Sequence, residues 1–152
     1  MSASFRITLA PPLIYLLFAS FAWALHAQLA LPWPWPGPSR AVGWTLLATA
    51  LALMAWSVLV MFRHRTTVNP YGQPRALVTG GPFAWSRNPI YLGDSLAFAS
   101  LALLLASPWP LLLLPAVMAC MNQGVIEREE RRLQATFGAA YDAYRARVRR
   151  WL

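Results

Sequence analysis

Long apolar runs separated by short polar stretches organise this chain. One run covers about residues 9–31 and a second about residues 41–62, and each is long enough to cross a ~30 Å hydrocarbon core as a helix. A third run, about residues 90–123, is interrupted at Ser107-Pro108-Trp109-Pro110, which leaves two helices of roughly 15 to 17 residues. We therefore expect an all-α, polytopic membrane protein with about four transmembrane helices, the last two forming a short helical hairpin.

A different pattern follows the third run. From Val125 onward, apolar side chains recur at helical spacing with arginines between them. The stripe consists of Ile126, Leu133, Phe137, Tyr141, Tyr144 and Val148. This predicts a basic amphipathic helix on the cytoplasmic surface of the membrane. Phe137-Gly138 is where we expect that helix to bend or end before Tyr141.

Composition and charge support the membrane interpretation. Hydrophobic residues make up 58% and charged residues only 12% of the chain, whereas a soluble domain carries about a quarter charged residues. The net charge is +8, and four arginines lie within residues 63–87 while seven follow Glu127. Because arginine-rich segments stay inside, we expect both termini and the 63–87 loop to be cytoplasmic, in a bacterial inner membrane. Nucleic acid is therefore not an expected partner.

The length of the chain fits one domain. Its cysteine and histidine residues do not form a pattern typical of a metal site. Residues 1–152 are expected to form a single unit, with two spans in residues 1–62 and a cofactor-binding part in residues 63–152. The single cysteine, Cys120, excludes an internal disulfide and is expected to pack inside an apolar helix. No histidine pair has metal-ligand spacing, so no metal is expected.

The most informative stretch is LVTGGPFAWSRNPIYLG, residues 77–93. Gly80-Gly81-Pro82 cannot continue a helix, whereas Asn88 followed by Pro89 is typical of an N-cap and the first helical residue. Tyr91 then falls in the first turn, beside free backbone N–H groups that attract negative groups. With the acidic stretch at residues 127–130, this predicts that two polar borders meet over one ligand.

Two features of these borders have more than one interpretation. Asp94 lies one helical turn beyond Tyr91, and it is either an interfacial carboxylate bonded to an arginine or part of the site. The acidic cluster that begins at Glu127 is either a solvated, salt-bridged turn or a ligand-binding border.

Taken together, LVTGGPFAWSRNPIYLG, EREERRL and FGAAYDAYRARVRRWL, with RTTVNP ahead of them, resemble the isoprenylcysteine carboxyl methyltransferase and phospholipid methyltransferase superfamily of integral membrane enzymes. The resemblance covers about residues 62–152, and the first two apolar runs carry no family signal that we can read. It implies methyl transfer from S-adenosyl-L-methionine without a Rossmann fold. It also implies a lipidic acceptor from the bilayer: an isoprenylcysteine-like carboxylate, a phospholipid amine or a lipophilic thiol.

The resemblance also implies which residues act. The expected cofactor-binding residues are Arg75, Ala76, Leu77, Val78, Phe83, Asn88, Pro89, Ile90, Tyr91 and Glu129, and the expected catalytic residues are Arg87, Tyr91 and Glu130. Glu129 suits the amino group or ribose hydroxyls of the cofactor, and the aromatic faces of Phe83 and Tyr91 suit adenine or the sulfonium. An amine acceptor must first lose a proton, for which Glu130 or Asp94 is the expected base.

Two departures from the family pattern concern the acceptor. Asn88 stands where the prenylcysteine enzymes commonly have histidine, and Val125 stands where they have a substrate-side arginine. Both count against a prenylcysteine acceptor. The alternatives are a membrane NADPH-dependent oxidoreductase similar to sterol reductases, and a non-catalytic lipid-binding membrane protein.

Overall fold

The chain is built from helices joined by short connections. In the computed structural model, the described residues are 10–35, 37, 39–69 and 71–152. In chain order the elements are α1 (Pro11–Gln28), α2 (Ser39–Arg63), the 3-10 helix η1 (Gly81–Ala84), α3 (Pro89–Leu104), α4 (Trp109–Met121), the π-helix η2 (Asn122–Ile126), α5 (Glu127–Phe137) and α6 (Ala139–Arg147). The all-α prediction is confirmed for the described residues.

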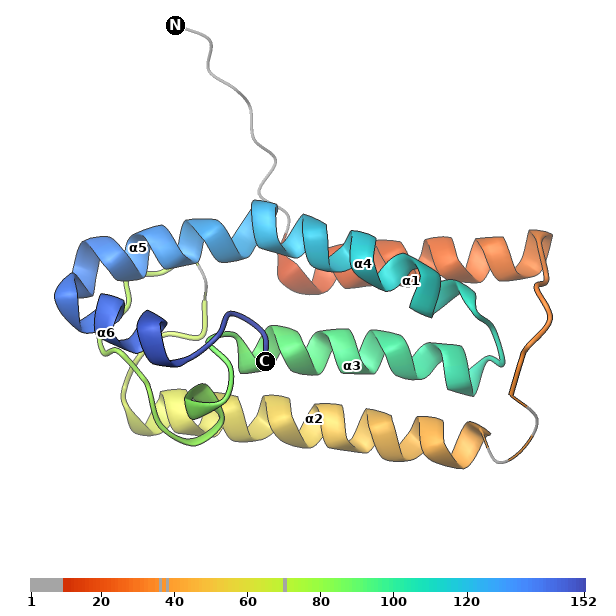
Figure 1. Cartoon of the computed structure of the whole chain (residues 1–152), viewed down its shortest axis with the longest axis horizontal. Coiled ribbons are helices and arrows are strands. Elements are labelled where there is room, and N and C mark those ends of the chain that lie inside the picture. Colours follow the sequence, from red (N-terminus) through yellow and green to blue (C-terminus); the bar gives the residue numbers. More distant parts are fainter. Residues whose placement is uncertain (1–9, 36, 38, 70) are drawn as a thin grey trace, which may run out of the picture.

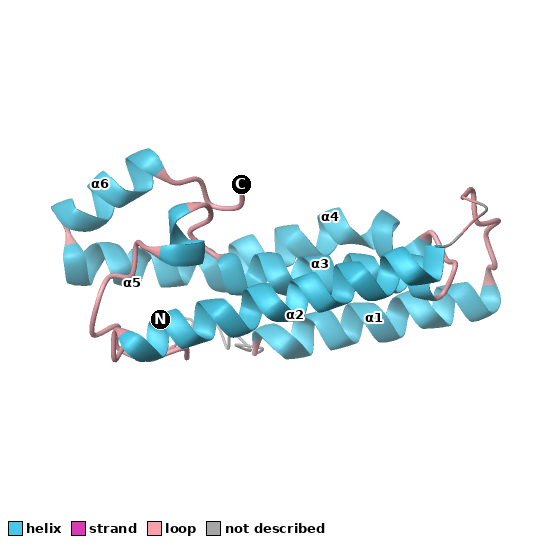
Figure 2. Ribbon diagram, turned by 90° about the horizontal axis from the view of Figure 1, so that it is seen from below, coloured by secondary structure: helices cyan, strands magenta, loops and turns pink. Residues whose placement is uncertain are grey.

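Helices α1 to α4 lie side by side and alternate in direction (Figure 1). The connection between α3 and α4 lies at one end of this bundle, and the connection between α2 and α3 lies at the other end, together with α5 and α6 (Figures 1 and 2). The predicted interruption of the third apolar run is confirmed, because α3 ends at Leu104 and α4 begins at Trp109. The up-and-down order therefore gathers the polar segments at one end.

Close packing of α2 against α3 depends on small residues. A Cβ atom added to Gly93 would lie 3.0 Å from the carbonyl oxygen of Ala50 and would also meet the side chain of Met54. Ala50 itself is fully buried. Small residues let helix backbones approach closely, which is how helices associate where no water drives them together. This contact fixes α3, and with it the start of the helix that carries Tyr91.

The outer faces of the bundle are apolar, as expected for a protein in lipid. Large exposed side chains include Leu16 and Trp23 of α1, Trp44 and Leu59 of α2, and Leu112 of α4. In the part of the chain that the structure describes, two helices, Ser39–Arg63 and the continuous helix Trp109–Phe137, are long and apolar enough to cross a membrane, and Pro89–Leu104 is a shorter apolar helix. The count of four spans stays a prediction.

The C-terminal part differs from the predicted single amphipathic helix. Helix α4 continues through the π-helix into α5 without a loop, and α5 ends at Phe137 because Gly138 takes a positive φ of 49°. A new helix, α6, starts at Ala139, which confirms the predicted bend or end at Phe137-Gly138. The sequence gives no sign of the π-turn, since its residues also suit an α-helix.

The expectation for Cys120 is wrong. Its side chain is exposed on the protein surface rather than packed inside. Cys120 lies on an outward-facing side of α4, whereas Val117 and Met121 of the same helix are fully buried.

Candidate active site

The connection between α2 and α3 forms one wall of the site and is held by its own polar groups. Thr66 Oγ1 accepts hydrogen bonds from the backbone N–H groups of Arg75 (3.1 Å) and Ala76 (3.4 Å), so the loop closes on itself. Asn69 holds the next part of the loop: the N–H of Tyr71 donates to Asn69 Oδ1 (3.0 Å), and the N–H of Gly72 donates to the Asn69 carbonyl (3.0 Å). The loop is therefore ordered by local bonds rather than by regular structure.

The two polar borders meet. Tyr91, in the first turn of α3, donates its hydroxyl proton to Glu129 Oε2 in the first turn of α5, at 3.0 Å. The partners lie 38 positions apart in the sequence. The prediction that these borders come together is confirmed, while their roles toward a ligand stay predictions.

A cluster of charges braces the site from the C-terminal side. Glu130 forms an ion pair with Arg87 (3.1 Å) and accepts two hydrogen bonds from Arg150, from Nε at 3.0 Å and from Nη2 at 2.7 Å. The side chains of Arg87 and Glu130 are only 10% and 13% exposed. The hydrogen bonds to Glu130 raise the pKa of Arg150, so the charged form is favoured.

The C-terminal tail crosses the segment just before α3. The carbonyl of Arg149 accepts from the N–H of Arg87 (2.9 Å), and the carbonyl of Arg150 accepts from Ser86 Oγ (3.2 Å) and Asn88 Nδ2 (2.9 Å). Asn88 is at the N-cap position as predicted, but its side chain makes no capping bond because it is used by the tail. The tail thus holds the residues that lead into Tyr91.

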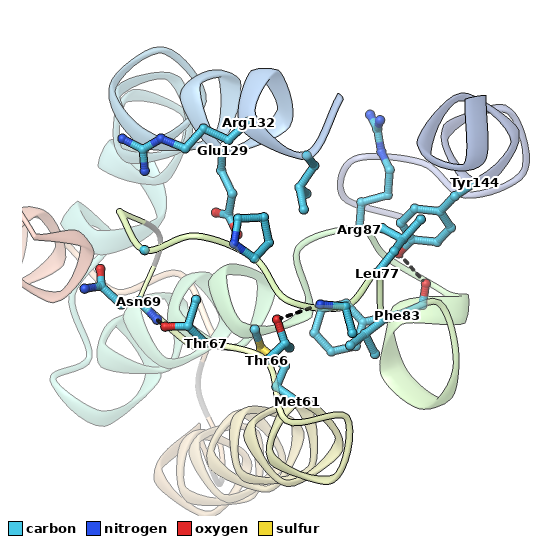
Figure 3. Close-up of a pocket in the computed structure, with 15 residues that line it drawn as sticks. Met61, Thr66, Thr67, Asn69, Leu77, Phe83, Arg87, Glu129, Arg132 and Tyr144 are labelled. Carbon is cyan, nitrogen blue, oxygen red and sulfur yellow. Dashed lines mark hydrogen bonds between the residues drawn. The ribbon is translucent and has the colours of Figure 1, made fainter. Parts of the chain in front are cut away.

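Two cavities adjoin these residues. The smaller, of about 60 Å³, is lined by Ala76, Leu77 and Val78, among others, and Figure 3 shows Tyr144 of α6 beside Leu77. The larger, of about 380 Å³, falls in the usual range of ligand sites and is lined by Asn88, Pro89, Ile90, Tyr91 and Asp94, among others. The residues common to both are Met61, Asn69, Phe83, Arg87 and Glu129. The two cavities are therefore neighbouring parts of one site.

Most of the predicted cofactor-binding residues line these cavities, and two of the predicted site residues do not. Arg75 lines a separate surface depression with Arg65 and Gln73. Glu130 lines neither cavity and is held by its two arginines.

Sequence reasoning missed several residues of the lining. Thr66 and Asn69 lie within RTTVNP, which carries part of the family resemblance but was not assigned to the site. Met61 precedes that motif, Tyr71 follows it, and Arg132 lies one turn after Glu129. Tyr144 was expected only as part of an apolar stripe, whereas its hydroxyl donates to the Phe83 carbonyl at 2.6 Å. The polar residues of RTTVNP itself were the signal for Thr66 and Asn69.

Electrostatics single out Glu129. The six charged residues that open α5 lie beyond the apolar part of the long helix, so Glu129 is outside the membrane segment. Burial raises its pKa to about 7, against the opposing influence of the Tyr91 hydrogen bond and of Arg132. A carboxylate in such surroundings is poised to gain from a cationic ligand.

Sequence comparison identifies the family. The family model described as phospholipid methyltransferase matches residues 38–140, which is more than half of the chain. The protein belongs to the phospholipid methyltransferase family. The match includes α2, so the expectation that the first two apolar runs carry no family signal is wrong for the second of them. No curated protein and no solved structure matches the chain.

Membership of the phospholipid methyltransferase family establishes the cofactor and the class of reaction. The protein is an integral membrane methyltransferase that uses S-adenosyl-L-methionine and acts on lipid substrates. The specific likeness to the isoprenylcysteine enzymes finds no separate support. The oxidoreductase and non-catalytic alternatives are set aside, because the family is one of methyltransferases.

The residues present fit this cofactor. Its ammonium and sulfonium groups are positive, and Glu129 places a carboxylate in the wall of both cavities. Its carboxylate is negative, and Arg87 Nε is buried without a hydrogen-bond partner among the described residues while Arg87 lines both cavities. An unpaired buried donor is costly, and a ligand carboxylate would satisfy it.

Proposed function

We propose that the protein transfers the methyl group of S-adenosyl-L-methionine to the amine of a phospholipid headgroup, in the site where Tyr91 meets Glu129. The observation that carries this proposal is the 3.0 Å hydrogen bond between these two residues, in the wall of a cavity of about 380 Å³. It joins the start of the helix after the Gly-Gly-Pro turn to the acidic stretch, which are the two segments that the family resemblance implicates.

The charges of the cavity favour an amine over a carboxylate acceptor. Glu129 and Asp94 both line the larger cavity, and Arg87 is the basic residue among the described residues of its lining. Arg87 is paired with Glu130, and its remaining donor, Nε, is the one that we assign to the cofactor's carboxylate, so no donor of Arg87 is left for an acceptor carboxylate. A carboxylate acceptor would be repelled by two acidic groups, whereas an ammonium headgroup would be attracted. The absence of the prenylcysteine pattern at Asn88 and Val125 points the same way.

The proposed roles follow from position. Glu129 holds the ammonium of the cofactor, Arg87 holds its carboxylate, and the rings of Phe83 and Tyr91 face its adenine or sulfonium. The cofactor supplies an activated methyl group, so the protein's main task is to align donor and acceptor and to exclude water, which contributes roughly 7–11 kcal/mol to such reactions. Glu130, fixed by two arginines, positions Arg87 rather than moving a proton.

The proposal puts this site at the cytoplasmic face of the membrane. Four arginines lie within residues 63–87 and seven follow Glu127, all in segments at the site end of the bundle. The sequence at the other end, residues 29–40, has a single arginine, Arg40. Because arginine-rich segments stay on the cytoplasmic side of a membrane, this uneven distribution supports a cytoplasmic site.

Cofactor binding in detergent tests the proposal. We expect the purified protein to bind S-adenosyl-L-methionine in titration calorimetry, and Glu129→Gln to weaken binding roughly 10- to 100-fold, because a charge-assisted hydrogen bond contributes about 1.5–3 kcal/mol. Glu127→Gln is the matched control, since Glu127 opens the same helix but lines neither cavity.

Methyl transfer is then measured directly. Radiolabelled cofactor is added to the protein with phosphatidylethanolamine vesicles, and label is counted in the lipid extract. Absence of cofactor binding by the parent protein, or equal loss in the Glu127 and Glu129 variants, would contradict the proposal.

A further inference from the structure

Asp94 is a carboxylate of the larger cavity for which the described residues supply no hydrogen-bond or ion-pair partner. It lies three residues after Tyr91 on α3, so the two side chains share a helix face, and both line the cavity with Glu129. Asp94 is half-buried, and within residues 10–35, 37, 39–69 and 71–152 it forms no hydrogen bond or ion pair. An unpaired carboxylate in a membrane helix is costly and marks a functional position.

The groups around Asp94 do not neutralise it. The acidic and phenolic groups near it are Tyr15 from α1, Tyr91 from α3 itself, Glu129 from α5 and Tyr71 from the connection between α2 and α3, and none of them is a cation. Helix α2 contributes the apolar side chains of Met54 and Met61 to the same cavity. The nearest basic group of the lining, Arg87, is paired with Glu130.

Glu130, the other carboxylate considered as a base, is differently placed. It accepts from two arginines and lies outside both cavities, so accepting a proton would break two charge-assisted interactions. Glu129 already accepts the Tyr91 hydrogen bond. Of the two carboxylates that line the larger cavity, Asp94 is therefore the one left available to the acceptor.

We propose that Asp94 is a catalytic residue that receives the proton which the acceptor's ammonium group must lose before it is methylated. This inference rests on the proposed function. One N–H bond breaks and the proton passes to the Asp94 carboxylate, which frees the nitrogen lone pair. A nitrogen–carbon bond then forms with the methyl carbon, and the carbon–sulfur bond breaks with its electron pair remaining on sulfur. The product is a methylated ammonium, and Asp94 returns its proton to water.

Substitution of Asp94 with a pH series tests this role. Parent, Asp94→Asn and Asp94→Glu proteins are assayed with radiolabelled S-adenosyl-L-methionine and phosphatidylethanolamine vesicles between pH 6.5 and 9.5. We expect Asp94→Asn to lower the rate at pH 7 roughly 100-fold, within the 10²–10⁴ range of acid–base catalysis, and Asp94→Glu to retain part of it. The Asn variant should recover about tenfold per pH unit, because water then removes the proton before binding.

Two controls separate this inference from others. Asp142→Asn, an amide replacement in α6 away from both cavities, should leave the rate unchanged. Cofactor affinity measured by calorimetry should change less than about twofold in Asp94→Asn, which also reports that the variant is folded.

The outcomes are distinct. If the parent methylates the lipid and Asp94→Asn matches it at pH 7, or shows the parent's pH slope, the role of Asp94 is overturned while the proposed function stands. If the parent binds no cofactor and methylates no lipid, the proposed function itself fails, and the inference falls with it.

Discussion

The membrane bundle and the polar end that covers it are held together in different ways. Helices α1 to α4 meet mainly through apolar and small side chains, as at Gly93 and Ala50, with few polar contacts such as that of Tyr15 Oη, 2.8 Å from Ser95 Oγ. The polar end, which we define as residues 63–88 and 127–152, is held by side-chain hydrogen bonds and ion pairs, among them the pair between Arg87 and Glu130.

This contrast indicates that the polar end, rather than the bundle, determines how specifically a ligand is bound. Apolar packing tolerates exchange of one large side chain for another, so the bundle fixes only where the polar end is placed. Directional bonds at the polar end fix individual side chains, and the proposed ligand contacts all depend on them. Perturbing the bundle should therefore change stability and binding together, whereas perturbing the polar end should change binding with a smaller effect on stability.

The largest effect is expected from Gly93→Val. The added side chain would press on the Ala50 carbonyl, 3.0 Å from the position of the new Cβ, and force α2 and α3 apart. Overpacking costs about 1–3 kcal/mol, so we expect a lower midpoint in detergent thermal unfolding together with loss of cofactor binding.

Gly124→Val is the control for this experiment, because nothing lies within 4 Å of the Cβ position at Gly124. A Gly93 variant that keeps its unfolding midpoint but loses binding would contradict the assignment of this contact to the bundle.

The second effect concerns the tail. Arg150→Ala removes both hydrogen bonds to Glu130 and leaves Glu130 with Arg87 alone. Because the Arg150 side chain is 32% exposed, we expect only about 1 kcal/mol of lost stability, but roughly tenfold weaker cofactor binding as Arg87 shifts.

Arg149→Ala is the matched control for the tail. The Arg149 side chain is exposed and its backbone carbonyl bond to Arg87 is retained in the variant. Equal effects of the two substitutions on calorimetric affinity would mean that overall charge, rather than the bond to Glu130, is responsible.

The polar end is also the part that the sequence reveals least. The bundle follows from the lengths of the apolar runs, and the meeting of Tyr91 with Glu129 follows from motifs on both sides of a hairpin. The C-terminal tail binds residues 86–88 through the backbone carbonyls of Arg149 and Arg150. Every residue has a backbone carbonyl, so the side chains of the tail do not predict this contact.

The π-helix after α4 is hidden for a similar reason. It lets the side chain of Asn122 accept from Trp151 Nε1 at 3.2 Å, which ties the tail to the bundle. Nothing in the residues of this turn distinguishes it from an α-helix, although π-turns often occur at functional sites.

The third prediction concerns the pH dependence of cofactor affinity. The Glu129 pKa is raised from its usual 4.5 to about 7, so below pH 7 the carboxyl must lose a proton before it can pair with the cofactor's ammonium. We expect affinity to fall about tenfold per pH unit below pH 7, and to fall again above about pH 8 as the ligand's amino group loses its proton.

The contribution of Glu129 to the free energy of unfolding changes with pH in the opposite direction to cofactor affinity. A carboxyl whose pKa is raised by folding binds more protons in the folded state, so its contribution to the unfolding free energy of the ligand-free protein decreases as pH rises from 4.5 to about 7. Calorimetric affinity and thermal unfolding across this range should thus move in opposite directions, and in Glu129→Gln both slopes should flatten. Parallel slopes would contradict the assigned titration.

The smallest effect on cofactor affinity is expected from Tyr91→Phe. This variant tests the difference between the bundle and the polar end most directly. The change removes the hydroxyl that donates to Glu129 Oε2 but keeps the ring, so the bundle should be undisturbed and affinity at pH 8 should fall only a few-fold. The hydrogen bond from Tyr91 favours the ionised carboxylate of Glu129, which lowers its pKa. Removing that bond should therefore move the midpoint of the binding curve above pH 7. Tyr144→Phe removes a hydroxyl in the lining of the smaller cavity that donates to the Phe83 carbonyl, and it should leave the midpoint in place. A midpoint that is unchanged in Tyr91→Phe would mean that Glu129 does not govern binding, and the meeting of the two polar borders would then be structural.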